Sequence, residues 1–276
     1  MNFEHIPKSN LHTHTRFADG KHTAEEVVLS AIEKGMEVIG FSEHSYNGRN
    51  DVYGMKDEGT VAAYRAEIQR LQKAYGERIR ILLGIEQDSF GGIPTAPYDY
   101  VLGSVHYVYL GGEFCAVDHS RAVMEDAIRR HCGGDPFVYT KEYYRLVAEV
   151  EKSTQCDIVG HFDLVTKFNE GGAMFDESDP RYVRPALEAL DALLEKDVIF
   201  EVNTGAISRG YRTTPYPATV FLRRIAEKRG TITVNADSHH KDTLTYAFDQ
   251  AFGILKACGI GSVLVMTRDG WKSYPL

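Results

Sequence analysis

The sequence predicts an α/β protein built on seven parallel strands. Seven short apolar runs of strand length recur along its 276 residues, and seven amphipathic segments of helix length lie between and after them. Several runs are apolar almost without interruption, as expected for strands covered on both faces. Repeated alternation of strand and helix favours parallel strands joined by right-handed crossovers. A closed seven-stranded barrel suits a single domain of this length, and an open doubly wound sheet is the alternative.

The expected elements follow one another without a linker, a repeat or a low-complexity segment. The strands are predicted at Ser9–His12, Val38–Ser42, Ile79–Glu86, Tyr100–Val105, Asp157–Gly160, Val198–Val202 and Thr231–Val234. The helices are predicted over residues 23–35, 59–75, 119–131, 140–153, 180–196, 217–229 and 244–258. Thr23 and Glu26 have the spacing of a capping box at the start of the first helix, and Gly35 is its stop signal.

Two polar, Gly-rich segments, Tyr107–Asp118 and Phe168–Asp179, interrupt this alternation. We expect both to be loops. Loops at the carboxyl ends of barrel strands build active sites, so these two segments are candidate walls of a substrate site.

The composition is that of a folded protein with an acidic surface. The formal net charge is −8, 43% of the residues are hydrophobic and 25% are charged. This balance argues against nucleic acid or an anionic membrane as a partner. The four cysteines form no Cys-x-x-Cys pair, and the chain begins without a basic segment followed by an apolar run. We therefore expect a cytoplasmic protein with no membrane segment.

Residues that can bind metal ions recur at the ends of the predicted strands. Six of the seven strands end in His, Asp or Glu, at the edge where parallel α/β proteins bind ligands. The residues, in chain order, are His12, His14, Glu43, His44, Glu86, His106, His161, Asp237 and His239. A single histidine at a strand end is more often a hydrogen-bonded loop residue than a ligand. Burying a whole set of polar groups at one end of a barrel, its mouth, costs desolvation free energy unless the set binds a ligand or a metal ion.

The spacing of these residues strengthens the interpretation. In extended backbone, residues i and i+2 point to the same side, so His12/His14 and Asp237/His239 each form a two-residue chelator. Closing a parallel barrel places the first strand beside the last, which would bring both pairs to one site. Imidazole and carboxylate ligands suit Zn, Mn or Fe, and no thiolate belongs to the set.

The strand ends and the loops beside them contain six motifs: His12-Thr-His14 with Asp19-Gly20, Ser42-Glu43-His44, Gly84-Ile85-Glu86, Ser104-Val105-His106, Gly160-His161-Phe-Asp163 and Asn235-Ala-Asp237-Ser238-His239. Together these motifs resemble those of the polymerase-and-histidinol-phosphatase (PHP) family, and more narrowly of its histidinol-phosphatase branch. The resemblance implies a distorted (β/α)7 TIM-like barrel, with residues 1–276 forming one phosphoesterase domain.

The resemblance also implies three divalent metal ions, of zinc, iron or manganese. Carried over motif by motif, His12, His14, Glu86 and Asp237 would hold the first ion. Glu86 would bridge to a second ion bound by His106 and His161. Asp19, His44 and His239 would hold the third ion, and Asp19 stands where many relatives have His. Three divalent ions and three carboxylates would leave about +3 in the mouth, enough to attract phosphate to an acidic protein.

The implied activity is hydrolysis of a small phosphate ester, with L-histidinol phosphate of histidine biosynthesis as the leading substrate. Our mechanistic hypothesis is attack by a metal-activated hydroxide without a covalent intermediate. Lys167 and either Arg209 or Arg212 would bind the phosphate. Glu113 and Asp118 are loop candidates for recognising the amine of the substrate.

Other interpretations of the sequence remain open. One is a PHP phosphoesterase that acts on another phosphate ester or on nucleic acid, and another is a non-catalytic metal-binding protein. Cys115 and Arg121 have the Cys-x5-Arg spacing of cysteine phosphatases. However, the segment between them contains Asp118 and no glycine, which disfavours a phosphate-cradling loop.

Overall fold

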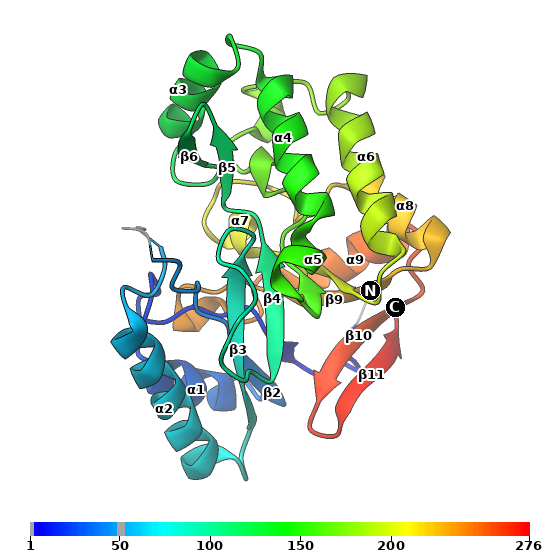
Figure 1. The fold of residues 1–276 in the computed structure, drawn as a ribbon. Coiled ribbons are helices and arrows are strands. Elements are labelled where there is room, and N and C mark those ends of the chain that lie inside the picture. Colours follow the sequence, from blue (N-terminus) through cyan, green and yellow to red (C-terminus); the bar gives the residue numbers. More distant parts are fainter. Residues whose placement is uncertain (1–2, 49–52) are drawn as a thin grey trace.

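The computed structural model describes residues 3–48 and 53–276, and its main feature is a sheet of seven parallel strands with helices around it (Figure 1). The sheet strands are β1 (Ser9–Asn10), β2 (Val38–Phe41), β3 (Arg80–Asp88), β4 (Tyr100–Ser104), β7 (Ile158–Val159), β8 (Ile199–Asn203) and β9 (Thr231–Asn235). The main helices are α1 (Ala24–Glu33), α2 (Glu58–Tyr75), α3 (Arg121–His131), α4 (Pro136–Ala148), α6 (Pro180–Leu194), α8 (Thr219–Lys228) and α9 (Phe248–Ala257).

Shorter elements complete the chain. They are the helices α5 (Val150–Thr154) and α7 (Gly205–Ser208), the 3₁₀ turns η1 (Leu164–Thr166), η2 (Glu170–Gly172) and η3 (Lys241–Thr243), and the hairpins β5 (Tyr107–Leu110)–β6 (Glu113–Ala116) and β10 (Ser262–Thr267)–β11 (Gly270–Pro275). The predicted capping box is confirmed, because the Thr23 side chain accepts from Glu26 N and the Glu26 carboxylate accepts from Thr23 N.

The sheet order is β1-β2-β3-β4-β7-β8-β9, and it closes into a barrel only at the carboxyl ends of its outer strands. There His14 N donates to Ser238 O (2.8 Å) and Ser238 N donates to His12 O (3.0 Å). These two bonds join the segment after β1 to the segment after β9. The nearly closed seven-stranded barrel confirms the predicted fold class and excludes the open-sheet alternative.

The interior of the barrel is filled by apolar side chains from its strands and from the C-terminal hairpin. The cluster consists of Leu11, Val38, Leu82, Tyr100, Leu102, Ile158 and Met266. The Tyr100 hydroxyl donates to Leu11 O (2.5 Å) and Phe41 O (3.1 Å), which ties three strands together. Gly40 and Gly84 leave the space for this ring, since a Cβ at either position would overlap it.

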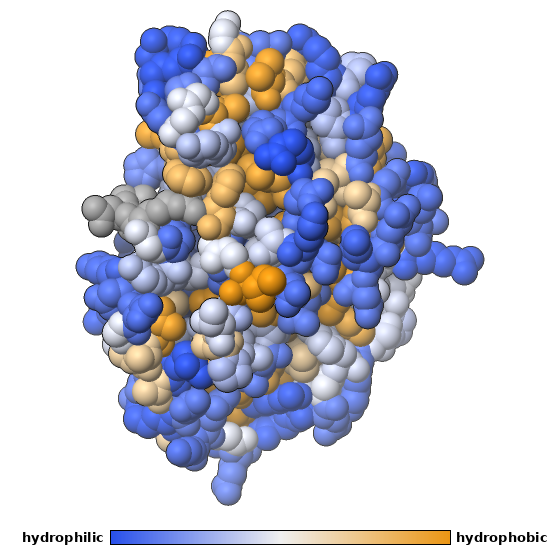
Figure 2. Space-filling model, in the orientation of Figure 1, coloured by the Kyte–Doolittle hydropathy of each residue, from blue (hydrophilic) through white to orange (hydrophobic). Residues whose placement is uncertain are grey.

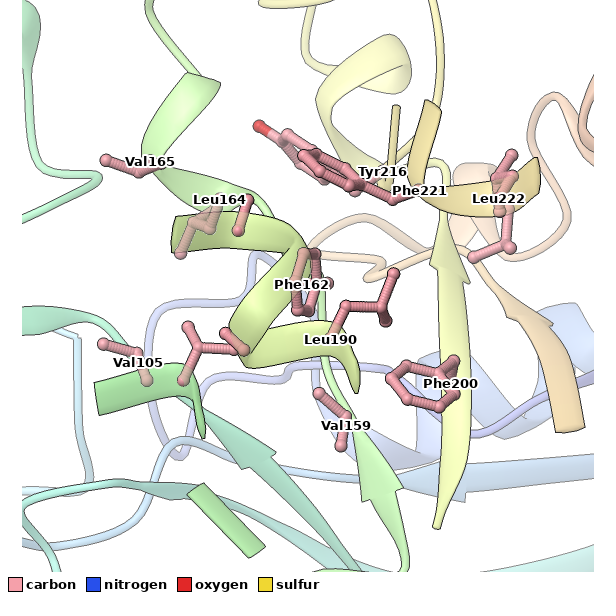
Figure 3. Packing of buried hydrophobic residues seen from close by; sticks show 14 of the residues in the cluster. Val105, Val159, Phe162, Leu164, Val165, Leu190, Phe200, Tyr216, Phe221 and Leu222 are labelled. Atoms are coloured by element: carbon pink, nitrogen blue, oxygen red, sulfur yellow. The ribbon is translucent and has the colours of Figure 1, made fainter. Parts of the chain in front are cut away.

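The largest core lies between the second half of the sheet and helices α4, α6 and α8. Figure 3 shows Phe162, Leu190 and Phe200 directed into this core from the segment after β7, from α6 and from β8. The Phe162 ring packs against Tyr144 and Phe221. Because Phe162 directly follows His161, this packing fixes the backbone from which the His161 ring projects.

Two expectations from the sequence need correction, and one element of the fold was not expected. The segment Tyr107–Asp118 is not an irregular loop, because residues 107–116 form the β5–β6 hairpin. The helix predicted over 140–153 begins earlier, at Pro136, and is broken into α4 and α5 at Glu149. The unexpected element is the β10–β11 hairpin: β10 contains the apolar run Val263–Met266, but its partner β11 carries none.

The surface has the polar character expected from the composition. The face shown in Figure 2 is mostly hydrophilic, with separate apolar patches among the charged side chains. In the described part of the chain, no helix combines the length and apolar character needed to cross a bilayer. All four cysteines are free and buried.

The fit of Tyr100 against Gly84 can be tested by adding one methyl group. We expect Gly84→Ala to lower the free energy of unfolding by about 1–3 kcal/mol or more, because the new methyl overlaps a ring with no room to move. For a chain of this size, that corresponds to a fall in Tm of roughly 2–4 °C per kcal/mol in thermal unfolding.

Gly253→Ala is the matched control. Gly253 lies in α9, and a Cβ there would meet nothing within 4 Å. Alanine should keep or raise the Tm, since it is the better helix former by up to about 1 kcal/mol. Equal Tm changes in the two variants would contradict the proposed packing constraint.

Candidate metal centre

The nine predicted metal ligands lie together in the mouth of the barrel. His12 and His14 follow β1, His44 follows β2, Glu86 lies in β3, His106 follows β4, His161 follows β7, Asp237 and His239 follow β9, and Asp19 lies in the loop after β1. Parallel strands end at one edge, so side chains far apart in the chain converge there.

Glu86 is the centre of this cluster. It is 1% exposed, and its carboxylate contacts imidazoles from four other strand ends. The nearest nitrogens are His44 Nδ1 (2.8 Å), His161 Nε2 (2.9 Å), His106 Nε2 (3.3 Å), His12 Nε2 (3.4 Å) and His14 Nε2 (3.6 Å). The Ser104 hydroxyl also donates to Glu86 Oε1 at 2.6 Å. A carboxylate with this many partners is suited to bridge more than one cation.

Two further carboxylates complete the cluster. Asp237 Oδ1 lies 3.4 Å from His14 Nε2 and 3.6 Å from His12 Nε2. Asp19 Oδ2 lies 3.2 Å from His239 Nε2, and Asp19 Oδ1 lies 3.8 Å from His44 Nε2. Shared imidazoles therefore connect the three carboxylates. His12 and His14 each contact both Asp237 and Glu86, and His239 contacts both Asp237 and Asp19.

Four overlapping groups in this cluster have donor atoms within 4.8 Å of one another and could each hold a metal ion. They are His14–Asp19–His44–His239, His12–His14–Asp237, His12–Glu86–His161 and His44–Glu86–His106. All nine predicted residues appear in these groups. The sharing of Glu86, His12, His14 and His44 between groups is what a multinuclear centre requires.

Several polar atoms in the cluster have no hydrogen-bond partner. His12 Nε2, His14 Nε2 and Asp19 Oδ1 are buried and unpaired. Leaving buried polar groups without partners costs roughly 1–3 kcal/mol each. Imidazole nitrogens and carboxylate oxygens are ligands of divalent transition metals. The donor set and its unpaired atoms therefore fit bound metal ions.

The loops after β1 and β2 are shaped to present Asp19 and His44. A Cβ at Gly20 would overlap the His14 backbone carbonyl, so only glycine lets the Asp19 loop fold back onto this strand end. The Glu43 carboxylate accepts from Thr15 N (2.9 Å) and from the Thr15 hydroxyl (2.5 Å), which fixes one loop against the other. Burial raises the pKa of Glu43 to about 7.

The electrostatics of the cluster favour ionised carboxylates and a neutral His14. Burial, together with the neighbouring His239 and His44, lowers the pKa of His14 to about 3. A neutral ring is the form that binds metal. Burial acts to raise the pKa of Asp237, but the Arg209 guanidinium and His12 hold this pKa well below its ordinary value.

Arg209 lies against the cluster. Its Nη2 donates to Asp237 Oδ2 (2.8 Å), and its Nη1 donates to the Asp237 carbonyl (2.7 Å) and lies 3.0 Å from His239 Nδ1. Gly205 leaves the space for this pair, since a Cβ there would lie 2.8 Å from Asp237 Oδ2. A quarter of the Arg209 side chain stays exposed to solvent.

Arg212 has a different environment. Its guanidinium is paired with Glu177 (2.8 Å) and Glu170 (3.1 Å), and it donates to Thr166 O (2.8 Å). These contacts hold η1 and η2 against the loop after α7. Lys167 pairs with Asp118, at 3.3 Å from Oδ2, and its Nζ lies 5.0 Å from the centre of the Tyr211 ring.

The cysteine-phosphatase pattern has no support in the structure. Cys115 is buried in β6, and this burial raises the pKa of its thiol. The Arg121 guanidinium donates to Glu125 and to Ala173 O. The thiol is therefore held in its unreactive protonated form.

Comparison with known proteins decides the family. The family model of the PHP domain matches residues 10–205, a segment that contains all but two of the nine clustered residues. The chain belongs to the PHP domain family. This result confirms the resemblance inferred from the motifs.

Individual PHP relatives match over most of the chain. The histidinol-phosphatase of Lactococcus lactis subsp. lactis is 30% identical over 72% of this chain and 72% of its own length. A relative from Schizosaccharomyces pombe is 26% identical over 91% of this chain and 85% of its own length.

Solved structures share the PHP barrel. A Listeria monocytogenes structure has a TM-score of 0.76 at 20% identity and covers 88% of this chain and 99% of its own. The Lactococcus lactis histidinol phosphate phosphatase, solved with zinc, L-histidinol and phosphate, has a TM-score of 0.71 at 24% identity and covers 96% of this chain and 98% of its own. At these identities the structures establish the fold.

One buried acidic residue of the PHP barrel was missed by the sequence analysis. Glu201 lies in β8, the strand that ends without a predicted ligand, and its carboxylate accepts a 2.7 Å hydrogen bond from His12 Nδ1. The available signal was a charged residue inside the apolar strand Ile199-Phe200-Glu201-Val202.

The unpaired atoms of the cluster predict that metal ions stabilise the protein. We expect Zn²⁺ or Mn²⁺ at 100 times its Kd to add about 2.7 kcal/mol for each occupied site. The Tm should rise by roughly 5–10 °C relative to chelator-treated protein. Glu86→Gln, which removes the shared carboxylate charge, should lose most of this metal-dependent rise. An unchanged Tm on chelation of the wild-type protein would contradict the prediction.

Proposed function

We propose that this protein is a metal-dependent phosphomonoesterase that hydrolyses L-histidinol phosphate to L-histidinol and phosphate in histidine biosynthesis. The observation that carries the proposal is the converging set of three carboxylates and six imidazoles around Glu86 in a PHP-family barrel. The Lactococcus lactis histidinol-phosphatase, similar over 72% of both chains, supports the choice of substrate.

Three divalent ions would be held by the nine clustered residues. The first would bind His12, His14, Glu86 and Asp237, the second Glu86, His106 and His161, and the third Asp19, His44 and His239. Such ions supply Lewis-acid chemistry toward phosphate oxygens and lower the pKa of water. The protein's part is to hold neutral imidazoles and ionised carboxylates in place in a buried mouth, and no covalent phosphoenzyme is required.

Arg209 is the proposed phosphate-binding residue of the two arginines. It lies beside Asp237 and His239 with part of its guanidinium exposed, so it can donate to a phosphate oxygen as charge develops there. Arg212 is neutralised by Glu177 and Glu170, and a guanidinium with two carboxylate partners has little capacity left for substrate. We assign Arg212 to the support of the loop.

Lys167 and Asp118 form the proposed opposite wall. Burial acts to raise the pKa of Asp118, but Lys167 and His106 lower it below its ordinary value, so Asp118 is an anion near the cluster. Asp118 Oδ1 is buried and unpaired. We propose that it accepts from the ammonium group of the substrate while Lys167 faces the phosphate. Glu113 is excluded from this role, because it is exposed and paired with Arg130.

The remaining assignments rest on the same arrangement. We propose that residues 1–276 act as one domain, since all the clustered residues come from a single sheet and the segments that follow its strands. A cytoplasmic location and the absence of nucleic-acid partners stay predictions from the sequence.

The proposed function is tested by measuring phosphate release. Metal-loaded protein should prefer histidinol phosphate over sugar phosphates, nucleotides and an ester of similar size without an amine, and chelation should abolish turnover. Asp118→Asn should raise KM for histidinol phosphate by about 10-fold or more, as expected for loss of a charge-assisted hydrogen bond. The same substitution should leave KM for the amine-free ester unchanged. Equal kcat/KM for all esters would reject the substrate, and full activity without metal would reject the mechanism.

The two arginines give a second, matched test. We expect Arg209→Ala to lower kcat/KM about 100-fold, because a donor to the developing phosphate charge is lost. Arg212→Ala should change kcat/KM less than about 5-fold but lower the free energy of unfolding by about 1–3 kcal/mol, since it leaves the carbonyl of the buried Thr166 without its donor. The reverse pattern in steady-state kinetics and thermal unfolding would exchange the two roles.

A further inference from the structure

Glu201 is a buried carboxylate that the proposed chemistry does not use. It is 1% exposed and lies in β8, inside the barrel. Its Oε1 accepts from His12 Nδ1 (2.7 Å) and Asn235 Nδ2 (3.0 Å). Its Oε2 accepts from His161 N (2.9 Å) and Asn203 Nδ2 (2.8 Å). These four donors satisfy the full accepting capacity of an ionised carboxylate.

This arrangement determines which nitrogen of His12 carries a proton. An ionised carboxylate can only accept, so the bond to Glu201 requires a proton on His12 Nδ1. The opposite nitrogen, Nε2, lies 3.4 Å from Glu86 Oε1 and 3.6 Å from Asp237 Oδ1 and has no hydrogen-bond partner. In the neutral ring, the lone pair of Nε2 therefore points into the cluster.

The same carboxylate holds a second part of the cluster. Glu201 accepts from His161 N and thereby fixes the backbone at the end of β7. The His161 ring projects from this backbone, and its Nε2 lies 2.9 Å from Glu86 Oε1. Through Asn235 it is connected to β1, because Asn235 Oδ1 accepts from Leu11 N (2.8 Å). Glu201 thus links β8 to the segments that carry His12 and His161.

We propose that Glu201 is a positioning residue of the metal centre, which fixes the His12 ring with Nδ1 protonated and Nε2 free to bind a metal ion, and which holds the His161 backbone with its other oxygen. The proposal rests on the metal centre of the proposed function. It explains why β8 ends without a metal ligand of its own, because its inward carboxylate, Glu201, is hydrogen-bonded to the ligand His12 and does not itself face the metal site. Hydrogen bonds from metal-binding histidines to carboxylates fix ring orientation and raise metal affinity.

Glu201→Gln is the informative substitution because it keeps the shape and removes one accepting oxygen. Whichever way the amide is turned, its NH₂ group faces two donors, either His12 Nδ1 and Asn235 or His161 N and Asn203. The His12 ring can relieve the first conflict only by moving its proton to Nε2, which blocks the ligand atom. The second conflict displaces the His161 backbone.

The test measures metal retention instead of catalysis. Zinc-loaded wild-type protein and variants are equilibrated against graded concentrations of a chelator, and the zinc retained per chain is measured by elemental analysis. We expect Glu201→Gln to lose at least one ion at a 10- to 100-fold lower chelator concentration than wild type. Glu201→Asp, which keeps the charge, should lie between the two. In ¹⁵N-histidine-labelled protein, the protected His12 Nδ1–H signal should be lost in Glu201→Gln when the amide NH₂ faces His12 and kept when it faces His161, and zinc retention should fall in both cases.

Asp163→Asn is the matched control. Asp163 is also fully buried, but its carboxylate accepts from Ala218 N (2.8 Å) and is bonded to no ring of the cluster. Its substitution should lower the Tm and leave zinc retention at the wild-type level. Equal loss of zinc in Asp163→Asn and Glu201→Gln would show general loosening and overturn the proposal, as would wild-type retention in Glu201→Gln.

Failure of the proposed role of Glu201 can be distinguished from failure of the proposed function. Wild-type protein that retains zinc but does not hydrolyse histidinol phosphate would reject the substrate and leave the role of Glu201 to be decided by the retention curves. Wild-type protein that retains no zinc would reject the metal centre and the role of Glu201 together.

Discussion

The ionised carboxylate of Glu86 sets the main constraint on this protein. Removing such a group from water costs several kcal/mol even after the protein relaxes, unless cations or hydrogen-bond donors surround it. Here the compensation comes from Ser104 and from imidazoles at the ends of four other strands. Because these imidazoles come from the ends of β1, β2, β4 and β7, those strands must end at the same level around Glu86. The geometry of the barrel mouth follows from this requirement.

The closure of the barrel serves the same requirement. The bonds through Ser238 are made between the backbones of the two chelating pairs, so the seam closes where the ligands are. Below this point, hydrogen bonds from Leu11 N to Asn235 Oδ1 and from Ala236 N to Asn10 Oδ1 connect the same two ends of the sheet, and the Tyr100 ring packs against Gly40 and Gly84 inside the barrel. A site built on strand ends and backbone hydrogen bonds keeps its ligands within the narrow tolerance that metal binding demands. Asp19 and Lys167 come from loops, where more adjustment is possible.

How much could be predicted from the sequence follows from these physical differences. The strand ends could be identified because buried parallel strands read as apolar runs, and a histidine directly after such a run has a defined position. The different environments of Arg209 and Arg212 could not be predicted, since they depend on Glu170 and Glu177, which only the fold brings near Arg212. Glu201 was missed because its role is defined by partners on three other strands. The C-terminal hairpin was missed because a polar strand such as β11 is stabilised by its pairing with β10 and not by its own pattern.

The charges of the mouth explain why a phosphate site of this kind depends on metal ions. Asp19, Glu86, Asp237 and Glu201 bring four carboxylates to the mouth, where Arg209 is paired with Asp237 and Lys167 with Asp118. Burial acts to lower the pKa of His12, His44 and His106, but the neighbouring carboxylates raise it above its ordinary value, so without metal these rings carry protons that offset part of the negative charge. Divalent cations would replace these protons and bring a larger positive charge, which would attract a phosphate dianion. The buried carboxylates therefore have one electrostatic role, which is to concentrate positive charge in the mouth, and metal ions would fill this role more strongly than protons.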